Sequence, residues 1–148
     1  MAEQLYYEDV KEGNELPTLI KHPTPRQLVM WAGASGDFTE IHYDKDFALS
    51  QGLPGIIVHG DLTNAFLAQL ITDWMGELGT FKKLRTSNRD MLIPDTDIFL
   101  KGKVSKKYIE GNEHCVECEI WVENYKHEKC VLGIAVVTLP ARGSNIAA

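Results

Sequence analysis

The segment spanning residues 60–75, or as far as 78, most strongly limits the folds open to this chain, because apolar residues surround almost the whole circumference of a helix drawn through it. These residues are Leu62, Ala65, Phe66, Leu67, Ala68, Leu70, Ile71, Trp74 and Met75. A helix of this kind is buried almost all round. Over residues 81–139 the apolar period changes to two, which is typical of strands. We therefore expect an α+β fold in which a long antiparallel sheet wraps around a central helix.

The period-two region divides into separate predicted strands. They cover residues 81–88, 97–108, 114–123 and 130–139, with turns near 110–113 and 126–128. The last segment is nearly continuous in apolar residues, which favours a central strand.

Two shorter helices are predicted before the long one. Thr24 is a typical N-cap and is followed by Pro25 at the first helical position, so a helix is expected from there to about residues 33–36. A second helix is expected from Asp44, most simply its N-cap, to a stop at Gly52.

Composition limits the classes of function. At 148 residues, without repeats or a linker, residues 1–148 are expected to form one domain. Fifteen basic and twenty-one acidic residues give a net charge of −6, which argues against sequence-independent binding of nucleic acid. No apolar run reaches the roughly 18 residues needed to span a bilayer, and no signal-peptide pattern opens the sequence. We expect a cytoplasmic protein that binds neither nucleic acid nor membrane.

Three cysteines suit a reducing compartment. Cys115 and Cys118 form a C-x-x-C, but the alternating pattern around them predicts a strand, which places the two thiols on opposite faces. No second pair of matching spacing exists, so we expect neither a zinc nor a redox site.

The chemistry-bearing residues lie between Ser35 and Leu62. Asp37 and His42 stand five positions apart, a spacing that neither a helix nor a strand turns onto one face, so a bent loop is needed to present both to one pocket. Gly60 opens the long helix, where a backbone N–H and the helix dipole favour negative charge. Taken singly, Asp37 is a typical turn residue and His42 a typical hydrogen-bonded structural histidine.

This region resembles the MaoC-like (R)-specific enoyl-CoA hydratases and dehydratases of the hot-dog fold. The family pattern reads Ser-Gly-Asp, any residue, Asn-Pro, any residue, His, any residue, Asp, then an alanine-containing helix, then Ile-x-His-Gly-Met-Leu. The matching positions are Asp37, His42, Asp44, Ala48, His59, Gly60 and Leu62. The chain departs from the pattern at Thr39 and Glu40, which replace Asn-Pro, at Asp61, which replaces Met, and at Ala68, where some members have serine.

The resemblance implies that water is added to, or removed from, a 2-enoyl or 3-hydroxyacyl thioester of coenzyme A or acyl carrier protein, without a cofactor or metal. It implies that Asp37 and His42 hold one water and share the acid and base roles, and that the N–H of Gly60 binds the thioester oxygen. His59 is grouped with Gly60 as an oxyanion or substrate-binding residue; it is expected to orient the loop by hydrogen bonding and is a weaker catalytic candidate than His42. Asp61 is expected to point away from the site or to contact a partner chain.

The resemblance also implies a homodimer, although some divergent members that act on bulky acyl-CoA work with a second hot-dog subunit. Two alternatives stay open: a non-catalytic or partner-dependent subunit that binds acyl-CoA, and a hot-dog thioesterase. Thioesterases of this fold usually carry an acidic residue on the central helix, so the Asp37 and His42 pair favours the hydratase.

Overall fold

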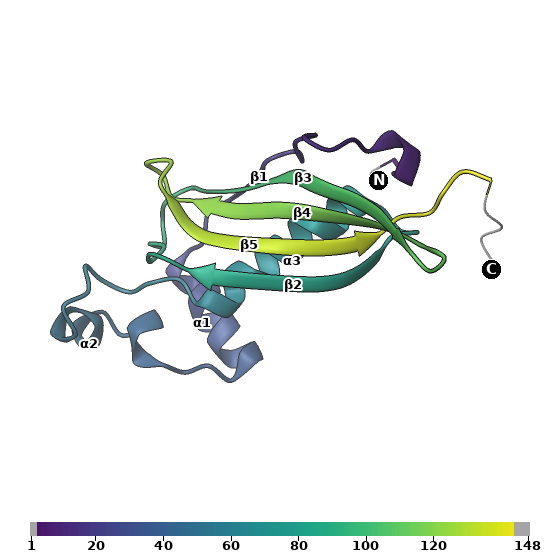
Figure 1. The fold of residues 1–148 in the computed structure, drawn as a ribbon. Coiled ribbons are helices and arrows are strands. Elements are labelled where there is room, and N and C mark those ends of the chain that lie inside the picture. The colour runs from purple at the N-terminus through teal and green to yellow at the C-terminus, as the bar shows by residue number, and fades with distance from the viewer. Residues whose placement is uncertain (1–2, 144–148) are drawn as a thin grey trace.

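The computed structural model describes residues 3–143, which form one curled antiparallel sheet with a long helix against it (Figure 1). The strands are β1 (Leu19–Lys21), β2 (Thr80–Asn88), β3 (Ile98–Glu110), β4 (Glu113–Glu123) and β5 (Lys129–Thr138). Their order in the sheet is β1-β3-β4-β5-β2. The helices are α1 (Pro25–Ser35), α2 (Lys45–Ser50) and α3 (Gly60–Met75), with short 3₁₀ turns at Tyr7–Asp9 and Glu40–His42. The predicted α+β architecture is confirmed.

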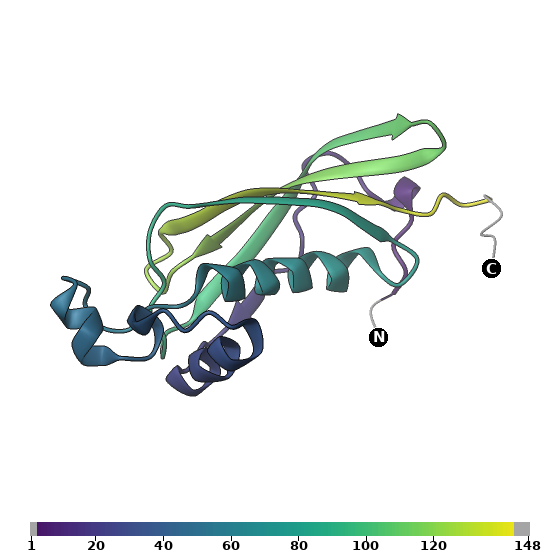
Figure 2. The ribbon, with the colours of Figure 1, turned by 90° about the horizontal axis from the view of Figure 1, so that it is seen from below.

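Helix α3 runs along one face of the sheet, and α1 and α2 lie together at one end of it (Figure 2). The buried positions of α3 are Leu62, Thr63, Phe66, Leu67, Leu70, Ile71 and Met75. The prediction of burial almost all round is wrong, because Thr72 and Asp73 are exposed and Ala68 is only half-buried. The sheet is open and covers one side of the helix, so the opposite side stays accessible in the single chain.

The four long strands fall where the sequence pattern predicts them. Strand β5 lies between β4 and β2, in agreement with its predicted interior position. Cys115 and Cys118 lie on β4, and both are buried free thiols. Burial raises the pKa of Cys118 to about 12, so this thiol stays protonated at neutral pH.

The predicted helix caps are present. The Thr24 side chain accepts a hydrogen bond from the backbone N–H of Gln27 at 3.2 Å, and Asp44 accepts one from Phe47 at 3.0 Å. Gly36 ends α1 in the left-handed region at φ 80°, which a residue with a side chain rarely adopts. This turn directs the chain into the loop that carries Asp37.

Strand β1 is not predicted by the sequence analysis. It has three residues, paired with β3 from Leu19 opposite Leu100 to Lys21 opposite Ile98, and this length is too short for a period of two to stand out. Among residues 3–143, no helix combines the length and the apolar character that crossing a bilayer requires.

Candidate active site

The carboxylate of Asp37 is held by Thr39. The Thr39 hydroxyl donates to Asp37 Oδ1 at 2.6 Å and the Thr39 backbone N–H donates to the same oxygen at 3.2 Å. These two hydrogen bonds hold the pKa of the Asp37 carboxyl below its usual value. Asp37 is therefore ionised at neutral pH, with Oδ2 left for another partner.

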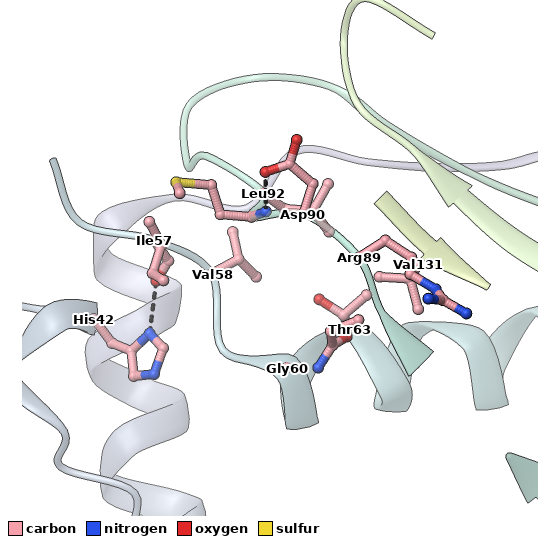
Figure 3. A pocket seen from close by; sticks show the side chains of 11 residues that line it. His42, Ile57, Val58, Gly60, Thr63, Arg89, Asp90, Leu92 and Val131 are labelled. Atoms are coloured by element: carbon pink, nitrogen blue, oxygen red, sulfur yellow. Dashed lines mark hydrogen bonds between the residues drawn. The ribbon is translucent and has the colours of Figure 1, made fainter. Parts of the chain in front are cut away.

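His42 is fixed by a backbone carbonyl from another segment. It ends the 3₁₀ turn Glu40–His42, and its buried ring places Nδ1 2.8 Å from the carbonyl oxygen of Ile57 (Figure 3). A carbonyl only accepts, so Nδ1 carries the hydrogen. In the neutral ring Nε2 is then an acceptor, and it lies 3.9 Å from Asp37 Oδ2.

The gap between Asp37 and His42 thus separates two hydrogen-bond acceptors. At 3.9 Å the atoms are too far apart for a direct hydrogen bond. A water molecule has two hydrogens and reaches each acceptor at about 2.8 Å. This geometry suits one water that donates to both groups, each of which is a base toward it.

His59 packs directly against His42. The two rings stack with centroids 3.8 Å apart and an interplanar angle of 19°. His59 Nε2 lies 3.3 Å from the carbonyl oxygen of Asp37, and the orienting role of His59 stays a prediction. The side chain is fully buried, and burial lowers the pKa of His59, so the ring is neutral. His59 Nδ1 has no hydrogen-bond partner among the described residues.

A cavity of about 330 Å³ opens beside His42 at the N-terminus of α3 (Figure 3). Its lining consists of His42, Ile57, Val58, Gly60, Thr63, Asn88, Arg89, Asp90, Met91, Leu92 and Val131. Gly60 is the first residue of α3, so its N–H has no partner within the helix. Asp37 is not on the lining, but its Oδ2 lies 3.9 Å from Nε2 of His42, which is on the lining. Asp61 is exposed and also lies off the lining, which leaves both expected alternatives, pointing away or contacting a partner chain, as predictions.

The three side chains of Asp37, His42 and His59 bring potential metal ligands within 4.8 Å of one another. Zinc binds imidazole nitrogens at about 2.0–2.1 Å along their lone pairs. The stacked rings are nearly parallel with centroids 3.8 Å apart, so an ion in the plane of one ring lies well outside the plane of the other. The arrangement fits a shared water better than a metal.

Sequence reasoning missed two residues of this site. Thr39 counted only as a departure from a pattern, although a threonine two positions after an aspartate is a recognisable turn signal. Asn88 gave no signal, because its place beside Gly60 depends on how β2 packs next to α3.

The fold and this site define a hot-dog protein with an Asp and His pair at the N-terminal end of its long helix. Residues 6–125 match the family profile described as the MaoC-like domain, and the chain belongs to this family. A curated relative, the 3-oxo-4,17-pregnadiene-20-carboxyl-CoA hydratase beta subunit of Mycobacterium tuberculosis, is 32% identical over 72 residues. That match covers 49% of this chain and 56% of the relative, so it spans little more than half of that protein.

Solved structures share the fold at low sequence identity. The R-hydratase PhaJ1 from Pseudomonas aeruginosa superimposes with a TM-score of 0.85 at 20% identity, covering 95% of this chain and 89% of that one. The (R)-hydratase from A. caviae involved in PHA biosynthesis has a TM-score of 0.81 at 20% identity, covering 90% and 99%. The ChsH1–ChsH2 complex from M. tuberculosis has a TM-score of 0.78 at 22% identity, covering 87% and 98%.

Proposed function

We propose that the protein is a hydratase or dehydratase that adds water to a 2-enoyl thioester or removes it from a 3-hydroxyacyl thioester. The observation that carries this proposal is the pair of acceptors, Asp37 Oδ2 and His42 Nε2, 3.9 Å apart beside the cavity. Membership of the MaoC-like family and the similarity to a curated CoA hydratase subunit support it. The relative acts on a CoA ester, and we propose a thioester of coenzyme A or acyl carrier protein here.

The chemistry needs a base for water, a proton for carbon 2 and a donor for the thioester oxygen. Asp37, which is ionised, and His42 hold the water. They take a proton from the water as the water oxygen bonds to carbon 3. The π electrons move toward the thioester oxygen, which accepts a hydrogen bond from the N–H of Gly60 at the positive end of α3. Asp37 and His42 then deliver the proton to carbon 2, so the net change is one added water.

The first prediction concerns substitutions of Asp37 and His42. Asp37→Asn and His42→Ala should each lower hydration by about a hundred- to ten-thousand-fold, the usual contribution of general acid and base groups. The measurement is the loss of conjugated thioester absorbance with crotonyl-CoA and with a bulkier 2-enoyl-CoA. Circular dichroism checks that both variants remain folded.

The chain offers a matched control in a second His and Asp pair. His22 Nδ1 lies 2.8 Å from Asp97 Oδ1, and both side chains are exposed. Asp97→Asn and His22→Ala should leave the rate unchanged. Full activity in Asp37→Asn or His42→Ala would contradict the proposed mechanism.

A second candidate function is a subunit that needs a different hot-dog partner. The observations that favour it are the name of the curated relative, a beta subunit, and the fold shared with the ChsH1–ChsH2 complex. Activity of the purified chain alone would exclude an obligate partner. An inactive chain that still binds an acyl-CoA would favour the heteromer.

A further inference from the structure

Asn88 places its side-chain carboxamide at the N-terminus of α3, beside Gly60. It is the last residue of β2 and stands opposite Val131 of β5. The described residues provide no hydrogen-bond partner for its side chain, although it lines the same cavity as His42 and Gly60. A Cβ built on Gly60 would lie 2.9 Å from Asn88 Nδ2, so the amide rests directly against this glycine.

The backbone after Asn88 is held firmly in place. The N–H groups of Arg89 and Asp90 both donate to the carbonyl oxygen of Cys130, at 2.8 and 3.0 Å. The end of β2 is therefore tied to the adjacent strand by two hydrogen bonds that leave the Asn88 side chain unengaged. A polar group carried on a rigid strand end is better positioned than one on a free loop.

We propose that Asn88 is a second hydrogen-bond donor to the thioester oxygen, acting beside the N–H of Gly60. This inference rests on the proposed function and adds to it a catalytic residue that touches the substrate. A carboxamide has two N–H donors and one acceptor, and within the described part of the chain no protein group hydrogen-bonds to them. The thioester oxygen gains negative charge during the reaction, so it binds the N–H donors of the carboxamide and not its carbonyl oxygen.

The glycine at position 60 leaves room for the Asn88 amide. Gly60 is not in the left-handed region, so its backbone conformation does not require glycine. The amide lies in the space that a side chain at this position would enter, so an added methyl group would displace the Asn88 amide from its place beside the Gly60 N–H. Glycine thus lets the carboxamide and the Gly60 N–H approach the same substrate atom.

The direct test is the infrared carbonyl stretch of bound butyryl-CoA carrying a ¹³C label at the thioester carbon. This saturated thioester has no double bond to hydrate, so the test does not depend on turnover. Hydrogen bonds to the carbonyl lower its stretching frequency. We expect a downshift in the wild-type protein that is smaller in Asn88→Ala and smallest in Asn88→Asp, whose carboxylate has the same shape but only accepts.

Kinetics provide the second measurement. Asn88→Ala should lower kcat with 2-enoyl-CoA by up to about a hundredfold, the lower end of the loss for an oxyanion-hole donor, because the side chain is exposed. The matched control is Ser87→Ala, since Ser87 precedes Asn88 on the strand and lies off the cavity lining. It should change neither the stretch nor the rate.

A double substitution tests the link to Gly60. Gly60→Ala should lower kcat strongly in the wild-type background and less in Asn88→Ala, because part of its effect is the displaced amide. Equal effects in both backgrounds would contradict the proposal.

The outcomes separate the two proposals. An unchanged carbonyl stretch in Asn88→Ala, or no binding of butyryl-CoA at all, overturns the role of Asn88. Full hydration activity in Asp37→Asn overturns the proposed mechanism, and the infrared comparison still decides the role of Asn88.

Discussion

Thr39 stabilises the charged form of Asp37. Its hydroxyl and backbone N–H both donate to one oxygen of Asp37, so the other oxygen remains available to a water next to His42. The hydrogen bonds favour the ionised carboxyl. A threonine at this position is therefore compatible with the base role of Asp37.

This contact predicts the effect of Thr39→Val. Removal of the hydroxyl takes away a hydrogen bond to the charged form, so the pKa of Asp37 should rise toward the usual value of about 3.9. The measurement is a ¹³C NMR titration of the Asp37 side-chain carboxyl in the wild-type protein and the variant. Thr72→Val, at an exposed position of α3, is the control. An Asp37 titration midpoint that does not move would show that the hydroxyl has no such effect.

Other residues of the site show what sequence can predict. The spacing of Asp37 and His42 required a loop, and that loop is present. The carbonyl of Ile57 that fixes the ring of His42 could not be predicted, since any residue has a carbonyl. Asn88 comes from a strand, and only the packing of β2 beside α3 brings it to Gly60.

At the scale of elements, local signals were sufficient for the helices. Side-chain caps at Thr24 and Asp44 and a left-handed glycine at position 36 fix helix ends within a few residues, independently of the rest of the chain. The extent to which α3 is buried depends on whether the sheet closes around it. Its apolar residues did not reveal that, and the predicted burial was too extensive.

The end of β4 contains a buried charge. Glu123 is 7% exposed and accepts hydrogen bonds from Trp121 Nε1 at 2.6 Å and from Lys101 Nζ at 3.0 Å. His127, in the turn to β5, lies 3.4 Å away. Burial by itself raises the pKa of Glu123, but the hydrogen bonds from Trp121 and Lys101 outweigh it and leave the pKa lowered. The carboxylate joins β3, β4 and the following turn.

This cluster predicts a pH-dependent loss of stability. A carboxyl whose pKa is lower in the folded state stabilises the protein above its unfolded pKa of about 4.3 and loses this effect as the pH falls through the folded value. Glu123→Gln should lower the free energy of unfolding at pH 7 by about 1–2 kcal/mol, because hydrogen bonds to a charged group are lost. The difference from the wild-type protein should shrink in more acidic solution.

Urea unfolding at neutral and acidic pH measures this difference. Glu119→Gln, at an exposed position of the same strand, is the matched control and should change little at either pH. A Glu123→Gln variant as stable as the wild-type protein at pH 7 would show that burial offsets the hydrogen bonds in full.

At the scale of the whole molecule, the single chain leaves apolar surface uncovered. Val29, Met30, Phe38 and Leu49 are each about half exposed or more, and they lie on or between the two helices at the end of the sheet. Among residues 3–143, no strand pairs with the outer edge of β2, and proteins normally cover or protect such an edge. A second subunit would cover such surfaces.

We therefore predict a dimer at micromolar concentration. Light scattering should give twice the chain mass of 16.6 kDa. A monomer under these conditions would contradict the homodimer and would direct attention to a different hot-dog chain as the partner.

His42 and His59 each form a hydrogen bond to a backbone carbonyl near the other histidine, so the two contacts run in opposite directions along the chain. His42 reaches forward to the carbonyl of Ile57, while His59 reaches back to the carbonyl of Asp37. Two hydrogen bonds thus hold the intervening segment near its ends, and the two histidine rings that form them stack against each other. Displacing either ring therefore disturbs the other, and these contacts couple the loop that carries Asp37 to the start of α3.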